Sequence, residues 1–370
     1  MPRGRAAELA RVICEVPAPT FEEERRAELV MSLWRAAGLE PRLDGIGNVV
    51  AEVPGGSGPR VLLAAHLDTV FDARSDVRVR ESGDRWYAPG LGDNSASLAV
   101  LTAAAEGIAG EAMVRRPRLL LAATVGEEGL GDLRGAKVLA NDHAGVVDAF
   151  LAIDGHLGGV VHQAVGSVRF EVRLRGPGGH SWGDHGTPSA VHALGDTIHA
   201  LSRLEVPNEP RSSLNVGLAH GGTAVNAIAE EASCVVDVRS VDGVVLGRLA
   251  RDAERRARSV GHRHGLEVSI TRVGERPAAS GGNEALVAAA ERALRSLGIE
   301  PQRSASSTDA NAAMALGIPA LCFGVYRGGD AHRAGEWIDP GSLEEGLTAL
   351  EALLGELCDS WTGEAGWRLP

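Results

Sequence analysis

The sequence lacks long hydrophobic runs. Hydrophobic residue types make up 44% of its 370 residues, yet no run approaches the roughly 18–20 consecutive apolar residues that a membrane-spanning helix needs. The opening stretch MPRGRAAELARVICEV contains neither a long apolar core nor a cleavage site of small residues, both of which a secretory signal peptide would have. We therefore expect a cytoplasmic protein without a membrane partner.

Cysteine and positive charge are also scarce. The four cysteines form no CxxC pair, and Cys234 and Cys322 lie in apolar, strand-like runs, so we expect buried free thiols. Lysine and arginine together number 37 against 49 acids, which gives a formal net charge of −12. A chain of this charge is repelled by phosphate backbones and by anionic lipid surfaces, so we expect no nucleic-acid partner.

The length and the order of predicted elements indicate two domains. A single hydrophobic core stops growing near roughly 250–300 residues, and this chain is longer. Buried strands alternate with helices up to residue 164 and again after residue 276, which is typical of a mixed sheet with helices on both faces. Residues 165–275 instead follow a β-α-β-β-α-β order, the ferredoxin-like arrangement. We therefore predict an α/β domain of residues 1–164 and 276–370, interrupted by an α+β domain.

Four continuous apolar runs predict strands that are covered on both faces: residues 61–65, 119–125, 150–153 and 319–325. Acids and histidines follow these runs or lie in adjoining loops: His66, Asp68, Asp93, Glu127, Glu128, Asp154 and His332. Parallel α/β sheets place their chemistry at the carboxyl ends of strands, where such side chains meet. Carboxylate and imidazole groups suit zinc or a similar divalent ion. The sequence thus predicts a two-metal site at one rim of the sheet.

Each of these residues has an ordinary alternative when it is considered alone. Asp93 could cap the helix that follows it, and Glu127, Glu128 and His332 could be solvated loop residues. Their positions also fit chemistry, because adjacent residues point in different directions. One glutamate can then bind metal while its neighbour serves as general base toward water. Asp68 shares a face with His66 on an extended chain and could accept a hydrogen bond from its ring.

Several short motifs resemble those of the M20 family of metallopeptidases, which includes peptidase T, glutamate carboxypeptidases, succinyl-diaminopimelate desuccinylase and aminoacylases. The resemblance runs through nearly the whole chain and rests on these segments: Ala65-His66-Leu67-Asp68-Thr69-Val70, Gly92-Asp93-Asn94-Ser95, Gly126-Glu127-Glu128-Gly129, Gly178-Gly179-His180-Ser181, Ser307-Thr308-Asp309-Ala310 and His332. It implies a mixed-sheet zinc-peptidase catalytic domain (1–164 and 276–370). It also implies an inserted ferredoxin-like lid domain (165–275) through which the chain forms a homodimer.

The resemblance implies two divalent metal ions per subunit, zinc first, with Co²⁺ or Mn²⁺ as alternatives. One ion would be held by His66, Asp93 and Asp154, and the other by Asp93, Glu128 and His332. Asp93 would bridge the two ions, and the peptide bond from Asp93 to Asn94 would be cis.

The family pattern also implies the catalytic and substrate-binding roles. Glu127 would act as general base and later as proton donor, and Asp68 would orient His66. A hydroxide that bridges the two metals would attack the scissile amide carbonyl. In the lid domain, His180 would stabilise the oxyanion across the dimer. Substrate contacts would come from Asn226 and from two arginines that face a substrate carboxylate, Arg239 and Arg276.

Three functions remain open at this point. The first is a dinuclear zinc peptidase that acts on short peptides, which the aspartate at Asp154 favours, because several family peptidases have aspartate there and some deacylases have glutamate. The second is an amidohydrolase that cleaves N-acyl amino acids with the same metals. The third is a non-catalytic peptide-binding homologue, and the intact Glu127 argues against it.

Overall fold

The computed structural model describes residues 4–110 and 116–363 of the chain. The chain forms two compact units: unit 1 comprises residues 1–164 and 280–370, and unit 2 comprises residues 165–279. The second boundary lies four residues after the predicted one. Ala278 accounts for part of this difference, because it packs against the hydrophobic core of unit 2.

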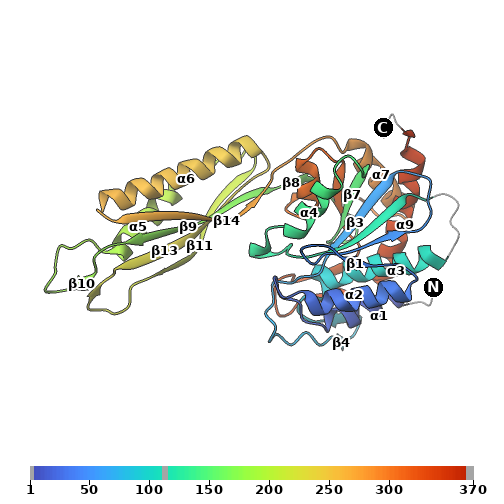
Figure 1. Cartoon of the computed structure of the whole chain (residues 1–370), viewed down its shortest axis with the longest axis horizontal. Coiled ribbons are helices and arrows are strands. Elements are labelled where there is room, and N and C mark those ends of the chain that lie inside the picture. The colour runs from blue at the N-terminus through green and yellow to red at the C-terminus, as the bar shows by residue number, and fades with distance from the viewer. Residues whose placement is uncertain (1–3, 111–115, 364–370) are drawn as a thin grey trace. The chain divides into compact units, whose positions relative to one another are not determined.

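Unit 1 is built on an eight-stranded mixed sheet (Figure 1). Its strands, in spatial order, are β1 (Arg42–Leu43), β2 (Val49–Val53), β6 (Arg118–Thr124), β3 (Arg60–His66), β7 (Ala149–Ile153), β16 (Ala320–Phe323), β8 (Gly159–Ala164) and β15 (Gln302–Ser306). The four central strands β6, β3, β7 and β16 pair in parallel. Their carboxyl ends therefore meet at one edge of the sheet, as the sequence predicted.

Strand β3 shows why the predicted apolar runs are continuous. Val61, Leu63 and Ala65 belong to the largest hydrophobic cluster, whereas Leu62 and Ala64 belong to a second cluster on the opposite face. Successive side chains of a strand point to opposite faces, so a strand covered twice needs apolar residues at every position. The first cluster includes residues of α1 (Arg5–Cys14), α2 (Glu24–Ala36), α3 (Ser97–Gly110), α7 (Glu284–Ser296) and α9 (Ser342–Ser360). The second includes residues of α4 (Arg134–Asp142) and α8 (Ala310–Ala315).

Unit 2 has the predicted β-α-β-β-α-β order. Its antiparallel sheet runs β11 (Ser212–Gly221), β13 (Glu231–Ser240), β9 (Gly166–Arg175) and β14 (Glu267–Arg276). Side chains alternate between buried and partly exposed along β13, because only one face of this sheet is covered. The covering helices are α5 (Ala190–Ser202) and α6 (Gly243–Arg263), which contact each other and the sheet (Figure 1). A short ribbon of β10 (Gly179–His180) and β12 (Ala227–Ile228) completes this unit.

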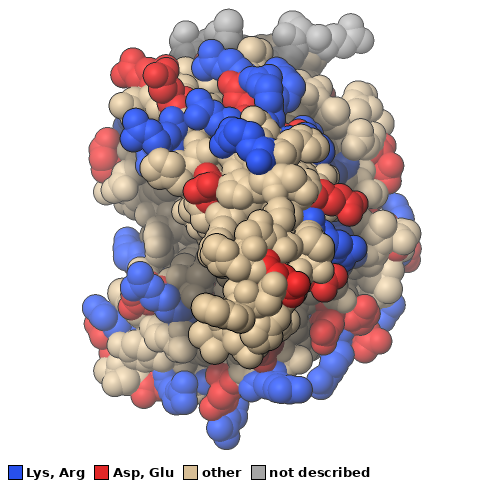
Figure 2. All heavy atoms as spheres, turned by 90° about the vertical axis from the view of Figure 1, so that its left-hand side faces the viewer, with Lys and Arg blue, Asp and Glu red and all other residues tan. Residues whose placement is uncertain are grey.

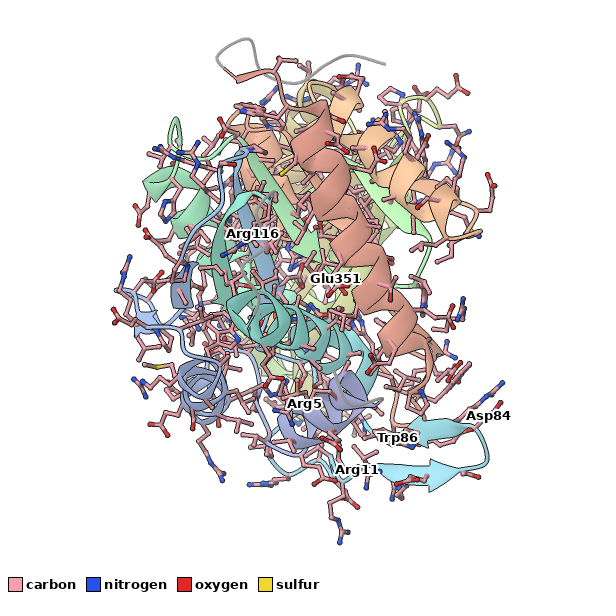
Figure 3. The ribbon with its side chains drawn as sticks, turned by 90° about the vertical axis from the view of Figure 1, so that its right-hand side faces the viewer. Arg5, Arg11, Asp84, Trp86, Arg116 and Glu351 are labelled. Atoms are coloured by element: carbon pink, nitrogen blue, oxygen red, sulfur yellow. The ribbon has the colours of Figure 1, made fainter. Side chains whose placement is uncertain are left out.

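Unit 1 also contains a second, small sheet that the sequence analysis did not predict. It consists of β17 (Arg327–Gly329), β18 (Trp337–Asp339), β5 (Arg85–Tyr87) and β4 (Arg80–Ser82). Figure 3 shows Asp84 at the turn between β4 and β5, and Arg11 of α1 beside Trp86. The Arg11 guanidinium lies 4.4 Å from the centre of the Trp86 ring, a cation–π contact that ties the hairpin to α1.

Two further sequence expectations concern membranes and thiols. Among the residues that the structure describes, no helix is long and apolar enough to cross a bilayer. The four cysteines are free, and three of them, Cys14, Cys234 and Cys322, are buried. Cys358 is only partly buried, so the expectation of buried thiols is confirmed for three positions.

Candidate metal centre

Two of the predicted metal ligands, His66 and Asp154, stand at the ends of neighbouring parallel strands of unit 1. His66 is the last residue of β3 and stands opposite Thr124, the last residue of β6. Asp154 directly follows β7, whose register with β3 pairs Ala152 with Ala64. His332 lies in the loop between β17 and β18. The parallel register thus brings side chains that are far apart in the sequence to one edge of the sheet.

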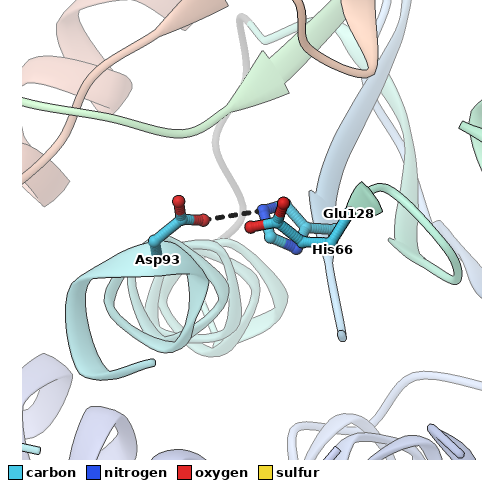
Figure 4. A group of neighbouring side chains, drawn as sticks. All are labelled: His66, Asp93 and Glu128. Carbon is cyan, nitrogen blue, oxygen red and sulfur yellow. Dashed lines mark ion pairs between the residues drawn. The ribbon is translucent and has the colours of Figure 1, made fainter. Parts of the chain in front are cut away.

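Asp93 lies at the centre of this group. One of its carboxylate oxygens, Oδ1, lies 3.0 Å from Nε2 of His66, and the other, Oδ2, lies 3.0 Å from Nε2 of His332. The same His332 nitrogen is 2.9 Å from Oε1 of Glu128. On the other side, Nε2 of His66 is 4.0 Å from Oδ2 of Asp154. Figure 4 shows Asp93, His66 and Glu128, whose possible ligand atoms lie within 4.8 Å of one another.

The charges of the site fit a pair of cations. Burial and the negative charge of Asp93 raise the pKa of Asp154 to about 8, so packing these acids together is unfavourable without a counter-charge. Hydrogen bonds to Asp93 and Glu128 raise the pKa of His332 to about 11. Imidazole nitrogens and carboxylate oxygens are ligands that zinc and similar divalent ions prefer. The donor set, with Asp93 facing both histidines, therefore matches the two ligand groups implied by the motifs.

Asp68 holds the His66 ring at its Nδ1 atom, and it does so chiefly with its backbone carbonyl group rather than with its side chain. Nδ1 of His66 lies 2.9 Å from the backbone carbonyl oxygen of Asp68 and 3.6 Å from its Oδ1. A carbonyl oxygen can only accept, so Nδ1 carries a proton, and in the neutral ring Nε2 then has the lone pair that a metal ion would use. This is the tautomer that a metal ligand needs.

The side chain of Asp68 organises the two glutamates, a role that the sequence did not reveal. It is fully buried, and it accepts backbone N–H bonds of 2.9 Å from both Glu127 and Glu128. The Thr20 hydroxyl donates a third bond of 2.9 Å. Burial lowers the pKa of His66, but hydrogen bonds with Asp68 and Asp93 raise it well above its usual value, and the charge of the buried Glu127 adds to this rise. One carboxylate thus sets the position of both the predicted base and a predicted ligand.

Other contacts hold the segment that carries Asp93. The peptide bond between Asp93 and Asn94 is cis, as the family resemblance implied. Nδ2 of the buried Asn94 donates a 3.0 Å bond to the carbonyl oxygen of Ile153, at the end of β7. On the other side, the segment is bonded to Glu336, a residue that sequence reasoning missed. A single glutamate in a polar loop has no pattern that would distinguish it from a solvated one.

The remaining predicted residues lie in unit 2. His180 is exposed, and its Nδ1 accepts bonds of 3.2 Å from the backbone N–H groups of Trp182 and Gly183. Because backbone N–H groups can only donate, Nδ1 is unprotonated in this arrangement, and a neutral ring carries its proton on Nε2. His180 therefore presents a hydrogen-bond donor, which is what oxyanion stabilisation requires. Asn226 directly precedes β12 and is exposed. Its backbone carbonyl oxygen accepts a 3.0 Å bond from the backbone N–H of Ser181.

The two predicted arginines belong to a larger cluster on the sheet of unit 2. Arg239 donates a 2.8 Å bond to Asp237, which also accepts a 3.3 Å bond from Arg169. Arg239 and Arg276 both stand opposite Ser167 of β9, on the two strands that flank it, and burial and the positive charge of Arg276 lower the pKa of Arg169. Arg169 was missed because its place in an alternating strand looks like an ordinary partly exposed position. The cluster combines three positive charges with the negative charge of Asp237.

Known proteins share both the sequence pattern and the fold. A family model described as peptidase family M20/M25/M40 matches residues 62–356. A protein of Mycobacterium tuberculosis assigned as the succinyl-diaminopimelate desuccinylase DapE is 27% identical over 369 residues, which cover 95% of this chain and 99% of the relative. Among solved structures, a tripeptidase from Staphylococcus aureus has a TM-score of 0.81 at 22% identity, with 97% of this chain and 99% of that chain covered.

A second solved structure, the YXEP protein of Bacillus subtilis, is described as a dinuclear metal binding peptidase from the M20 family. It has a TM-score of 0.69 at 17% identity and covers 96% of this chain and 98% of its own. At this identity the likeness concerns the fold, and it confirms the predicted α/β class with a mixed sheet. The family model spans most of the chain, and in unit 1 the motifs that it covers bring His66, Asp93, Glu128 and His332 together. The chain therefore belongs to peptidase family M20/M25/M40, the metallopeptidase family that its motifs resemble.

Proposed function

We propose that the protein is a dinuclear metal-dependent hydrolase that cleaves amide bonds of short peptides. The observation that carries this proposal is the position of Asp93, whose two oxygens face two different histidines at 3.0 Å each. A carboxylate placed in this way can bridge two cations. The description of the Bacillus subtilis structure as a dinuclear metal binding peptidase supports the same proposal.

In the proposed mechanism, His66, Asp93 and Asp154 would hold one ion, and Asp93, Glu128 and His332 would hold the other. We propose zinc as the metal, with Co²⁺ or Mn²⁺ as alternatives. The bound ions would polarise the substrate carbonyl and make water more acidic.

Glu127 would take a proton from the attacking water and deliver it to the leaving nitrogen. Its backbone is fixed by Asp68, so base and metal ligand keep a constant separation. The alternative of a non-catalytic peptide-binding homologue does not explain a buried acid that is held next to a ligand in this way.

We propose that two chains pair through unit 2 and that His180 of the partner subunit serves each site. Strand β11 lies at an edge of the unit 2 sheet, where another strand can pair with it. Trp182 and Val225 are strongly exposed apolar residues of the same unit, with Trp182 88% exposed. Figure 2, which views the chain from the side where Figure 1 labels β10, shows an area with few charges near its centre. These features favour a protein partner for this surface.

This proposal predicts complementation between two inactive chains. Glu127→Gln and His180→Ala proteins are each expected to be nearly inactive. After subunit exchange, activity should return to roughly a quarter of the wild-type value, because about half of the dimers are mixed and each has one intact site. Light scattering would establish that the active species is a dimer. No recovery after proven exchange, or full activity in a monomer, would contradict the proposal.

For the substrate, we propose peptides with a free carboxylate, bound by Asn226, Arg239 and Arg276. The arginine cluster supports this choice, because guanidinium groups bind carboxylates through paired hydrogen bonds. The specific alternative is a deacylase of N-acyl amino acids, which the desuccinylase assignment of the Mycobacterium tuberculosis relative favours.

The cytoplasmic location expected from the sequence stays a prediction.

A substrate panel separates these two activities. We expect higher kcat/KM for unblocked di- and tripeptides than for acetyl and succinyl amino acids, and a rise in KM when the terminal carboxylate is amidated. The panel would be measured with one metal-loaded preparation, so that all differences come from the substrate. Higher kcat/KM for succinyl or acetyl amino acids would instead establish the deacylase. An unchanged KM on amidation would show that Arg239 and Arg276 do not bind the substrate carboxylate.

A further inference from the structure

Glu336 is a buried acid behind the segment that carries Asp93. It is 1% exposed and lies in the β17–β18 loop, four residues after His332. Its Oε1 accepts backbone N–H bonds from Gly92 at 2.7 Å and from Asp93 at 2.8 Å, and its Oε2 accepts one from Gly90 at 3.0 Å. Both oxygens are therefore engaged by main-chain donors of one short segment.

The segment is shaped for this close contact. A Cβ atom added at Gly92 would lie 2.9 Å from Oε1 of Glu336 and 2.9 Å from the ring of Tyr326, so a larger residue does not fit there. Gly90 has a φ of 73°, a conformation that side chains disfavour. The glycines let the N–H groups of Gly90, Gly92 and Asp93 turn toward one carboxylate. On the far side, Asn94 anchors the segment to the end of β7.

We propose that Glu336 is a positioning residue for both metal ions, which it serves by fixing the main chain of Asp93. This inference rests on the proposed function, in which Asp93 is the shared ligand. Glu336 accepts a bond from the N–H of Asp93 itself. Rotation of the peptide between Gly92 and Asp93 would therefore move the Asp93 carboxylate away from both His66 and His332. Glu336 also joins the loop of His332 to the segment of Asp93, so two ligands of one ion are linked through it.

Glutamine is the informative replacement at this position. Glu336→Gln keeps the length of the side chain, but its amide nitrogen has no lone pair. At least one of the three N–H groups then meets a donor in place of an acceptor, and a buried donor without an acceptor is costly. Glu291→Gln is the matched control, because Glu291 is also a buried glutamate of unit 1. Its carboxylate accepts hydrogen bonds from Arg295 and Arg303, whereas that of Glu336 accepts bonds from the segment of Asp93.

The test measures metal affinity as well as activity. Zn²⁺ affinity would be obtained by competition with a chromophoric chelator, and Co²⁺ absorption would report the geometry around the ion. We expect Glu336→Gln to bind both ions about 10–100-fold more weakly than wild type, the usual effect of losing a group that orients a ligand. Glu291→Gln should bind them as wild type does. Asp154→Asn should weaken mainly one of the two ions, because Asp154 faces one histidine only.

The outcomes distinguish this inference from the proposed function. If wild type binds two ions and Glu336→Gln binds them with equal affinity and the same Co²⁺ spectrum, the inference is wrong and the hydrolase proposal stands. If wild type itself binds no divalent ion, the proposed function fails first. A matching loss in Glu291→Gln would mean general destabilisation and would also overturn the inference. Should Glu336→Gln not fold, Glu336→Asp, which keeps the carboxylate but is one methylene shorter, takes its place under the same criteria.

Discussion

Replacing Glu127 by glutamine is expected to lower kcat by about 10²–10⁴-fold, the usual contribution of a general acid–base group. Glutamine keeps the size and the hydrogen-bonding main chain of Glu127, so Asp68 still holds the turn. The amide cannot accept a proton from water at neutral pH, which removes the base without removing a ligand. Steady-state kinetics and a metal titration of the same preparation would measure both quantities.

Glu128→Gln is the natural comparison, because the two residues are adjacent and share the Asp68 carboxylate. Glu128 lies 2.9 Å from His332, so its replacement should weaken metal binding, and high metal concentration should restore part of the activity. A change of only a few-fold in Glu127→Gln would exclude Glu127 as the base. Tight peptide binding without turnover in the wild type would instead favour the non-catalytic alternative.

Removal of the metal ions with EDTA is expected to abolish turnover, and added Zn²⁺ or Co²⁺ should restore it. The same treatment should lower the melting temperature, because Asp93, Glu128 and Asp154 then lie close together without a cation between them. A ligand present at about 100 times its Kd stabilises the folded state by about 2.7 kcal/mol, so the change is measurable by calorimetry.

EDTA that has been saturated with Zn²⁺ beforehand is the control for effects of the chelator itself. The Asp93→Asn protein should show a smaller shift in melting temperature on metal addition than wild type does. Undiminished turnover in a preparation shown to be metal-free would refute the metal-dependent mechanism.

The sequence predicted those features that follow from periodic patterns. The apolar run of β3 ends at His66 and that of β7 ends before Asp154, and parallel pairing then required their side chains to meet. Apolar and polar residues alternate along β9, which is the pattern of a strand covered on one face only. The proximity of His66 and Asp154 was predictable because both stand at the ends of buried strands.

Other parts of the molecule have no such pattern. The exposed strand β15 (Gln302–Ser306) has five residues and each strand of the small sheet around Trp86 has three, which is too short to show a clear period. Arg169 and Glu336 act through three-dimensional neighbours, Asp237 and the segment before Asp93, that are distant in the sequence. Their roles depend on tertiary contacts, and the local composition of the sequence does not reveal such contacts.

The separation of the ligands along the chain has a consequence for biosynthesis. Asp93 and His332 are 239 positions apart, and the whole of unit 2 lies between them. A nascent chain on the ribosome therefore cannot close the cation-binding centre until nearly all of its residues have emerged. Contacts of such long range form slowly compared with local ones. The metal ions that we propose for this site can therefore bind with their full set of ligands only at the end of chain synthesis.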